Sequence, residues 1–148
     1  IMKKLFLSTL VLLSTMTFSH DEGHGPAIKD ESLKGGKVSA IIKKSDVNKG
    51  RSAKMLYKGE LVYESRKASV KLYLYDTNMK PLDLSSFAKK IDAVLFERGP
   101  GKNFQLSLDD SGKYYSGERP LNKRVPFNID VMPKKDGESL FGAFDGLD

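Results

Sequence analysis

The feature that most constrains the fold is a series of short segments in which apolar and polar residues alternate. The clearest of them runs from Ser69 to Tyr75, where Val70, Leu72 and Leu74 are separated by charged or aromatic residues. A repeat of two residues is the side-chain period of a β-strand with one face on a core. The pattern therefore predicts a strand over residues 69–75.

Similar segments recur along the chain and are separated by turn-forming residues. No long helical period, internal repeat or alternation of strands with helices is visible, apart from one possible helical turn at Asp83–Lys90. We therefore expect an all-β fold, an immunoglobulin-like antiparallel β-sandwich of seven or eight short strands, with a small β-barrel as the alternative. The expected strands cover residues 37–42, 56–64, 69–75, 91–96, 104–108, 113–116, 127–131 and 139–144.

The N-terminus has the pattern of a secretory signal peptide. Lys3 and Lys4 form a short basic region, an apolar run extends from Leu5 to Phe18, and small residues end at Ser19. Such a run is too short for a transmembrane helix, which needs about 20 residues. We expect residues 2–19 to be removed and the protein to be periplasmic or secreted. An uncleaved anchor and a buried helix are the alternatives.

Beyond the leader, the composition divides the chain into two parts. Residues 20–36 are polar and rich in glycine, and we expect a flexible lead-in there, followed by one β-sandwich domain over residues 37–148. Lys3 and Lys4 account for two of the six formal positive charges, so the remainder carries +4. Charges of both signs are mixed, without a long basic block. A nucleic-acid partner is not expected, nor is an integral membrane segment after cleavage.

The inventory of reactive side chains is small. The chain has no cysteine, which excludes disulfides, thiolate metal sites and a lipidated cysteine. Its two histidines, His20 and His24, both lie in the lead-in, so a Ser-His-Asp triad would have to take its base from there. Asp109 and Asp110 are adjacent, but before Gly112 they are typical turn residues. We expect a non-enzymatic protein.

The lead-in carries the one segment with ligand chemistry, HDEGHG. His20, Asp21, Glu22 and His24 offer two imidazoles and two carboxylates, and Gly23 allows them to converge. Nitrogen and oxygen donors without sulfur suit copper, nickel or zinc. Cleavage after Ser19 would add the α-amine of His20, whose ordinary pKa of about 7.7–8.0 lets a metal displace its proton near neutrality. The alternative is a soluble tail without a physiological metal, and a firm site needs a further carboxylate or tyrosine.

The six tyrosines allow two interpretations. Several alternate with aliphatic residues along expected strands, so some must lie on the face opposite the core. They could form an exposed binding surface. Equally, they could cover a sheet face and pair across strands, which is the more common arrangement.

One stretch carries a family resemblance. Residues 59–82, GELVYESRKASVKLYLYDTNMKPL, contain a Glu-Leu-Val strand, a strand ending Tyr-Leu-Tyr-Asp and a Lys-Pro turn. This resembles the small periplasmic β-sandwich domains associated with bacterial heavy-metal efflux adaptor proteins, in which a histidine-rich lead-in also precedes the domain. The chain lacks the coiled-coil hairpin and lipoyl-like region of a full adaptor. The resemblance implies a free-standing periplasmic module for metal binding or carriage.

Two functions follow as expectations. The first is an exported binding protein that holds or carries a divalent transition metal through His20, Asp21, Glu22 and His24, with a metal ion or periplasmic efflux and envelope proteins as partners. The second is a protein-interaction or envelope-structural module that uses a sheet edge or the tyrosines, with HDEGHG incidental.

Overall fold

The structure, a computed structural model, describes residues 25–28 and 32–148. The expected signal peptide and the HDEGHG ligands His20, Asp21, Glu22 and His24 lie outside the described residues. The described part contains nine strands and one 3₁₀ helix. They are β1 (Lys37–Lys43), η1 (Lys44–Ser52), β2 (Tyr57–Tyr63), β3 (Ser69–Tyr75), β4 (Lys90–Phe96), β5 (Lys102–Leu108), β6 (Tyr115–Glu118), β7 (Phe127–Met132), β8 (Lys134–Lys135) and β9 (Glu138–Leu147).

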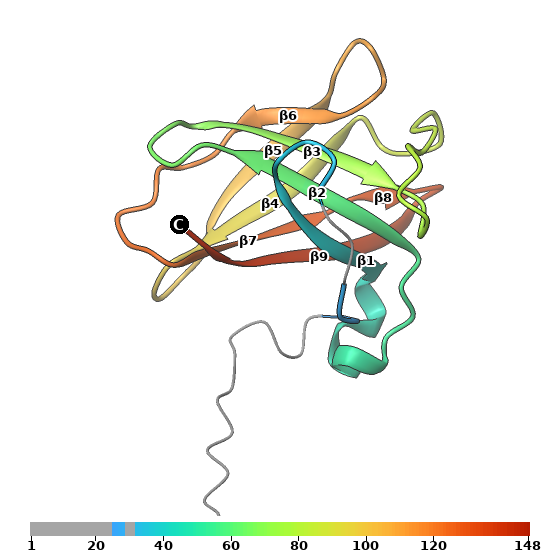
Figure 1. The fold of residues 1–148 in the computed structure, drawn as a ribbon, viewed down its shortest axis with the longest axis horizontal. Coiled ribbons are helices and arrows are strands. Elements are labelled where there is room, and N and C mark those ends of the chain that lie inside the picture. Colours follow the sequence, from blue (N-terminus) through green and yellow to red (C-terminus); the bar gives the residue numbers. More distant parts are fainter. Residues whose placement is uncertain (1–24, 29–31) are drawn as a thin grey trace, which may run out of the picture.

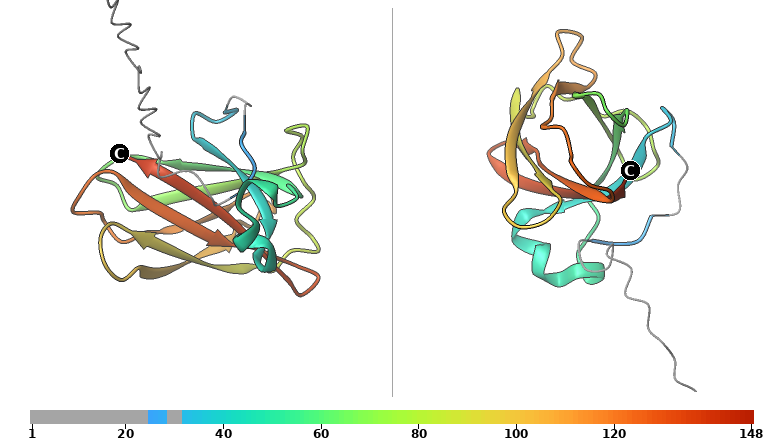
Figure 2. Two further views of the ribbon diagram at one scale, coloured as in Figure 1. Left: turned by 90° about the horizontal axis from the view of Figure 1, so that it is seen from below. Right: turned by 90° about the vertical axis from the view of Figure 1, so that its left-hand side faces the viewer.

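Eight of these strands close into an antiparallel barrel. They pair in the order β1-β2-β3-β6-β5-β4-β7-β9, and β9 pairs back to β1, with Ile41 opposite Gly142 and Lys43 opposite Leu140. The two-residue β8 extends the sheet by pairing with β9. Figure 1 shows β1 and β9 side by side, and the end-on view in Figure 2 shows the strands as a ring.

The all-β class is confirmed, and the small β-barrel is the architecture that the protein has. The immunoglobulin-like sandwich, our first expectation, is corrected because a sandwich needs two separate sheets. Here β1 is bonded on one side to β2 and on the other to β9, so one continuous sheet closes on itself. The alternation of apolar residues is the same in both architectures and does not distinguish them.

The barrel interior is the main core. Val70, Leu72 and Leu74 of β3 are at most 2% exposed and point inward, as their alternation predicts. Large side chains from the other strands meet them, among them Phe127 and Phe144. An eight-stranded barrel is just wide enough to be filled by its own side chains. The interior is thus occupied by the protein's own side chains, and the outer surface and the loops are the accessible parts of the barrel.

The outer face of β1 is buried as well. Ile42 is fully buried in a second cluster with Ala53, Phe141 and Ala143. Ala53 directly follows η1, so the end of this 3₁₀ helix lies beside the second cluster. Because both faces of β1 are covered, its sequence contains apolar residues on both faces, unlike that of β3.

The connection between β3 and β4 is a turn without a helix. The backbone N–H of Ser85 donates a 3.0 Å hydrogen bond to Oδ1 of Asp83, and the N–H of Phe87 bonds the carbonyl of Leu84 at 3.0 Å. Asp83 thus caps a turn, but the helical turn predicted over Asp83–Lys90 is not formed. The chain leaves this turn because Phe87 is buried and bridges Lys135.

Candidate functional site

The segment that follows HDEGHG lies against the barrel. A Cβ built on Gly25 would lie 3.7 Å from the Cβ of Ala40 and 3.8 Å from Cγ2 of Ile42, both on the outer face of β1. Residues 25–28 therefore pass over β1 where it pairs with β9. The last histidine of the motif, His24, is joined to this segment by a single peptide bond.

A pocket of about 260 Å³ lies beside residues 25–28. Its walls come from segments far apart in the sequence: the lead-in, β1, the end of η1 and the end of β9. Its polar and charged residues are Lys37, Ser39, Arg51 and Asp145, and the lead-in contributes Gly25, Pro26 and Ile28.

Asp145 is the carboxylate that the fold brings to this pocket. It is 7% exposed and lies on β9 two residues after Ala143, so the strand alternation turns both outward, toward the lead-in. Asp145 and Arg51 each interact with other groups of the protein. Sequence reasoning missed Asp145 because it ended the last strand at residue 144, and only the three-dimensional closure brings the end of β9 beside Gly25.

The described residues contain no group of three or more His, Asp or Glu side chains that could hold a metal ion by themselves. An imidazole ligand could come only from His20 or His24, the two histidines of the chain. The pocket supplies one carboxylate, and the histidines must come from the segment that precedes Gly25.

The tyrosines divide between the core and cross-strand pairs. Tyr115 is fully buried, its hydroxyl donates a 2.7 Å hydrogen bond to the carbonyl of Ala88, and burial raises its pKa to about 12. On the outer face, the rings of Tyr73 and Tyr114 lie 5.3 Å apart, and Lys71 lies 5.1 Å from the Tyr114 ring. The tyrosines therefore cover the sheet and pair across it.

None of the helical structure in the described part of the chain is long and apolar enough to cross a membrane. No protein-family model, curated protein or solved structure matches the chain. The fold therefore defines the protein as a small antiparallel β-barrel with a filled interior, and its function has to be argued from its own residues.

Proposed function

We propose that the protein is an exported, non-enzymatic binding protein that holds a divalent transition metal where its N-terminal segment meets the barrel. His20 and His24 supply imidazoles, and Asp21 or Glu22 supplies an oxygen. Asp145 is the further carboxylate that such a site needs. The observation that carries the proposal is the pocket shared by Gly25 and Asp145, because it brings the end of the HDEGHG motif to a carboxylate of the fold.

Chain geometry supports this arrangement. Neighbouring Cα atoms are 3.8 Å apart, so His24 begins one such step from Gly25, and His20 lies within about 18 Å of chain from it. Both imidazoles are therefore within reach of the pocket. Copper, zinc and nickel all accept nitrogen and oxygen ligands in this combination.

The charge balance of the pocket is also compatible with a cation. Lys37 and Arg51 place two positive charges in the lining. Asp145 offsets one of them, and Asp21 and Glu22 bring two further negative charges with the motif. A bound divalent ion would therefore face more carboxylates than cations, as a stable buried charge requires.

Titration calorimetry of the protein from His20 to Asp148, with Cu(II) and then Zn(II), tests metal binding. We expect one site tighter than about 1 μM, which corresponds to roughly −8 kcal/mol. Changing His20 or His24 to Ala should abolish it. Binding no tighter than that of a free histidine-containing peptide would refute the proposal.

The contribution of the barrel is measured separately. Asp145→Asn should weaken metal binding about tenfold or more, whereas Asp92→Asn, the same change on the exposed face of β4, should leave it unchanged. A synthetic peptide covering residues 20–28 should bind more weakly than the whole protein. Equal affinity of peptide and protein would show that the fold adds no ligand.

The resemblance to domains of heavy-metal efflux adaptors agrees with the proposal in the kind of ligand, although those domains are β-sandwiches and this protein is a closed barrel. The matching stretch forms β2, β3 and the turn that ends at the Tyr75–Pro81 bridge. The protein would carry a metal ion toward periplasmic efflux or envelope proteins. Loss of the protein should then sensitise cells to the metal that it binds most tightly.

A further inference from the structure

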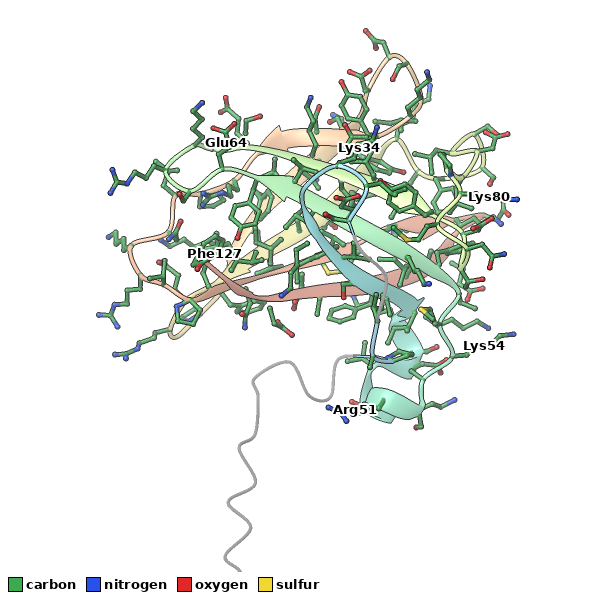
Figure 3. The ribbon with its side chains drawn as sticks, in the orientation of Figure 1. Lys34, Arg51, Lys54, Glu64, Lys80 and Phe127 are labelled. Carbon is green, nitrogen blue, oxygen red and sulfur yellow. The ribbon has the colours of Figure 1, made fainter. Side chains whose placement is uncertain are left out.

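Three loops at one end of the barrel form a surface that metal binding does not use. They are residues 64–68, 97–101 and 119–126, which connect β2 to β3, β4 to β5 and β6 to β7. They lie together at the left of Figure 1, near the labels of Glu64 and Phe127 in Figure 3, and face the viewer in the right-hand view of Figure 2. The loops hold six basic residues, Arg66, Lys67, Arg98, Arg119, Lys123 and Arg124, but only two acidic ones, Glu64 and Glu97.

Both acidic residues are already engaged. Glu64 pairs with Lys67 at 2.8 Å, and Glu97 pairs with Lys102 at 3.7 Å. The Glu97 carboxylate also accepts hydrogen bonds from the backbone N–H groups of Lys123 and Arg124. Among the residues that the structure describes, no ion pair is formed by Arg66, Arg98, Lys123 or Arg124.

The same end exposes apolar side chains. Leu121 is 51% exposed and Val125 is 63% exposed, and both project from the loop that carries Lys123 and Arg124. A groove of about 760 Å³ runs between this loop and Arg66, and Asp148 also lines it. Cations and apolar tips therefore lie on one projecting surface.

The loop has a fixed shape. The Glu97 carboxylate ties its backbone to the neighbouring loop, and at its base the buried Arg119 donates hydrogen bonds to Asn122 Oδ1 at 3.0 Å and to the carbonyl of Glu64 at 3.2 Å. The exposed side chains are thus presented by a braced backbone, which lowers the entropy lost when they bind a partner.

We propose that this end of the barrel docks on the surface of an anionic phospholipid bilayer. Lys123, Arg124 and Arg66 would contact lipid phosphates, while Leu121 and Val125 would enter the layer beneath. A bilayer offers phosphates that match these cations and, beneath them, an apolar layer that can take up Leu121 and Val125. An acidic protein surface would match the cations but offers no such apolar layer.

Vesicle co-sedimentation tests this docking. The protein is used from His20 onward, which keeps every described residue and removes the apolar leader. We expect binding to vesicles of phosphatidylcholine and phosphatidylglycerol, none to phosphatidylcholine alone, and a steep decline as salt is raised. Absence of binding at low ionic strength would overturn the proposal.

Two charge-reversed variants separate local docking from net charge. Lys123→Glu with Arg124→Glu should lower vesicle affinity at least about tenfold. Lys80→Glu with Lys113→Glu changes the net charge equally, on exposed loops at the other end of the barrel, where Figure 3 labels Lys80, and should bind nearly as well as the unaltered protein. Equal losses in the two variants would refute a specific docking surface.

A third variant tests the apolar contribution. Leu121→Ser with Val125→Ser leaves every charge in place and changes only exposed side chains, so the fold should be retained, as circular dichroism can verify. Its affinity for anionic vesicles should fall about tenfold while the salt dependence stays the same. Unchanged affinity would show that the loop contacts only the charged groups of the bilayer surface. It would overturn the proposed insertion of Leu121 and Val125 into the bilayer.

Discussion

The hydroxyl of Tyr75 on β3 donates a 2.9 Å hydrogen bond to Oε1 of Glu60 on β2, on the outside of the barrel. The Glu60 carboxylate is fully buried, and it also accepts hydrogen bonds from the backbone N–H groups of Leu33, Lys34 and Gly36, at 3.1, 2.9 and 2.8 Å. One carboxylate thus fastens the end of the lead-in to the barrel. It sets where the N-terminal segment approaches β1.

Replacing Glu60 by Gln should destabilise the protein by about 2–3 kcal/mol. The carboxylate accepts all four hydrogen bonds, whereas an amide has one oxygen and would turn its NH₂ group toward a backbone donor. Tyr75→Phe removes one of the four bonds and should cost about 1 kcal/mol. Urea unfolding curves measure both changes, and equal losses in the two variants would contradict the role assigned to the backbone N–H groups.

The same carboxylate makes stability depend on pH. Burial alone would raise the pKa of Glu60, but the hydrogen bonds from Gly36, Lys34, Tyr75 and Leu33 outweigh it and hold the pKa below its ordinary 4.5. A carboxyl whose pKa is lower in the folded state stabilises the fold above its unfolded pKa. That contribution disappears as the pH falls through the folded pKa.

We therefore expect the stability difference between the unaltered protein and Glu60→Gln to be largest near neutrality and to narrow below about pH 4. Other carboxyls with a lowered pKa, such as Asp83 and Asp109, also contribute to the pH dependence of stability. Their contributions cancel in this difference because both proteins contain them. Unfolding curves at pH 7 and at acidic pH measure it. A difference that does not change with pH would contradict the pKa assigned to Glu60.

The sequence predicted the strands well because the inward-facing apolar residues of each strand recur at every second position. The alternation over Ser69–Tyr75 matches β3 residue for residue, and the compact apolar run from Ile91 matches β4. The sandwich expectation was wrong because closure depends on the pairing of β1 with β9, about a hundred residues apart. No local sequence pattern shows which distant strand will pair with β1.

The candidate site was less predictable for the same reason. Asp145 reads as a polar residue near the C-terminus, and Glu60 reads as an ordinary solvent-facing residue of an expected strand. Their burial depends on the lead-in, which covers β1 and β2 from the outside. Composition marked residues 20–36 as polar, but it did not show that Leu33, Lys34 and Gly36 bond to the barrel.

Gly117 in β6 should be important for the close approach of β6 to β5 in the barrel. A Cβ on Gly117 would lie 2.5 Å from the carbonyl oxygen of Gln105 and 2.9 Å from Cδ2 of Leu106, both on the neighbouring β5. Because the nearest atom belongs to the backbone, the strands must separate to admit a methyl group. Gly117→Ala should cost about 1–3 kcal/mol, measured by thermal unfolding. Ser116→Ala, the adjacent residue, is the control and should cost much less.

Arg119 should be required for the shape of the loop that we propose to bind lipid. Arg119 is 3% exposed, and its Cζ lies 5.1 Å from the centre of the Phe127 ring. It forms no ion pair within the described residues. Burial lowers its pKa, and the nearby Tyr63 opposes that shift. A buried cation of this kind is tolerated because carbonyl oxygens and aromatic faces replace its water.

Arg119→Met keeps the apolar stem but leaves the carbonyls of Glu64 and Pro120 without their donor. We expect a loss of about 1–3 kcal/mol in unfolding free energy and faster proteolysis within residues 119–126. The buried Nε of Arg119 has no hydrogen-bond partner, so the arginine contributes less to the unfolding free energy than a fully bonded one would. The loss of unfolding free energy in Arg119→Met should therefore be smaller than that for a fully bonded buried arginine. If Arg119→Met were as stable and as protease-resistant as the unaltered protein, the packing of Tyr63 and Phe127 alone would hold the loop.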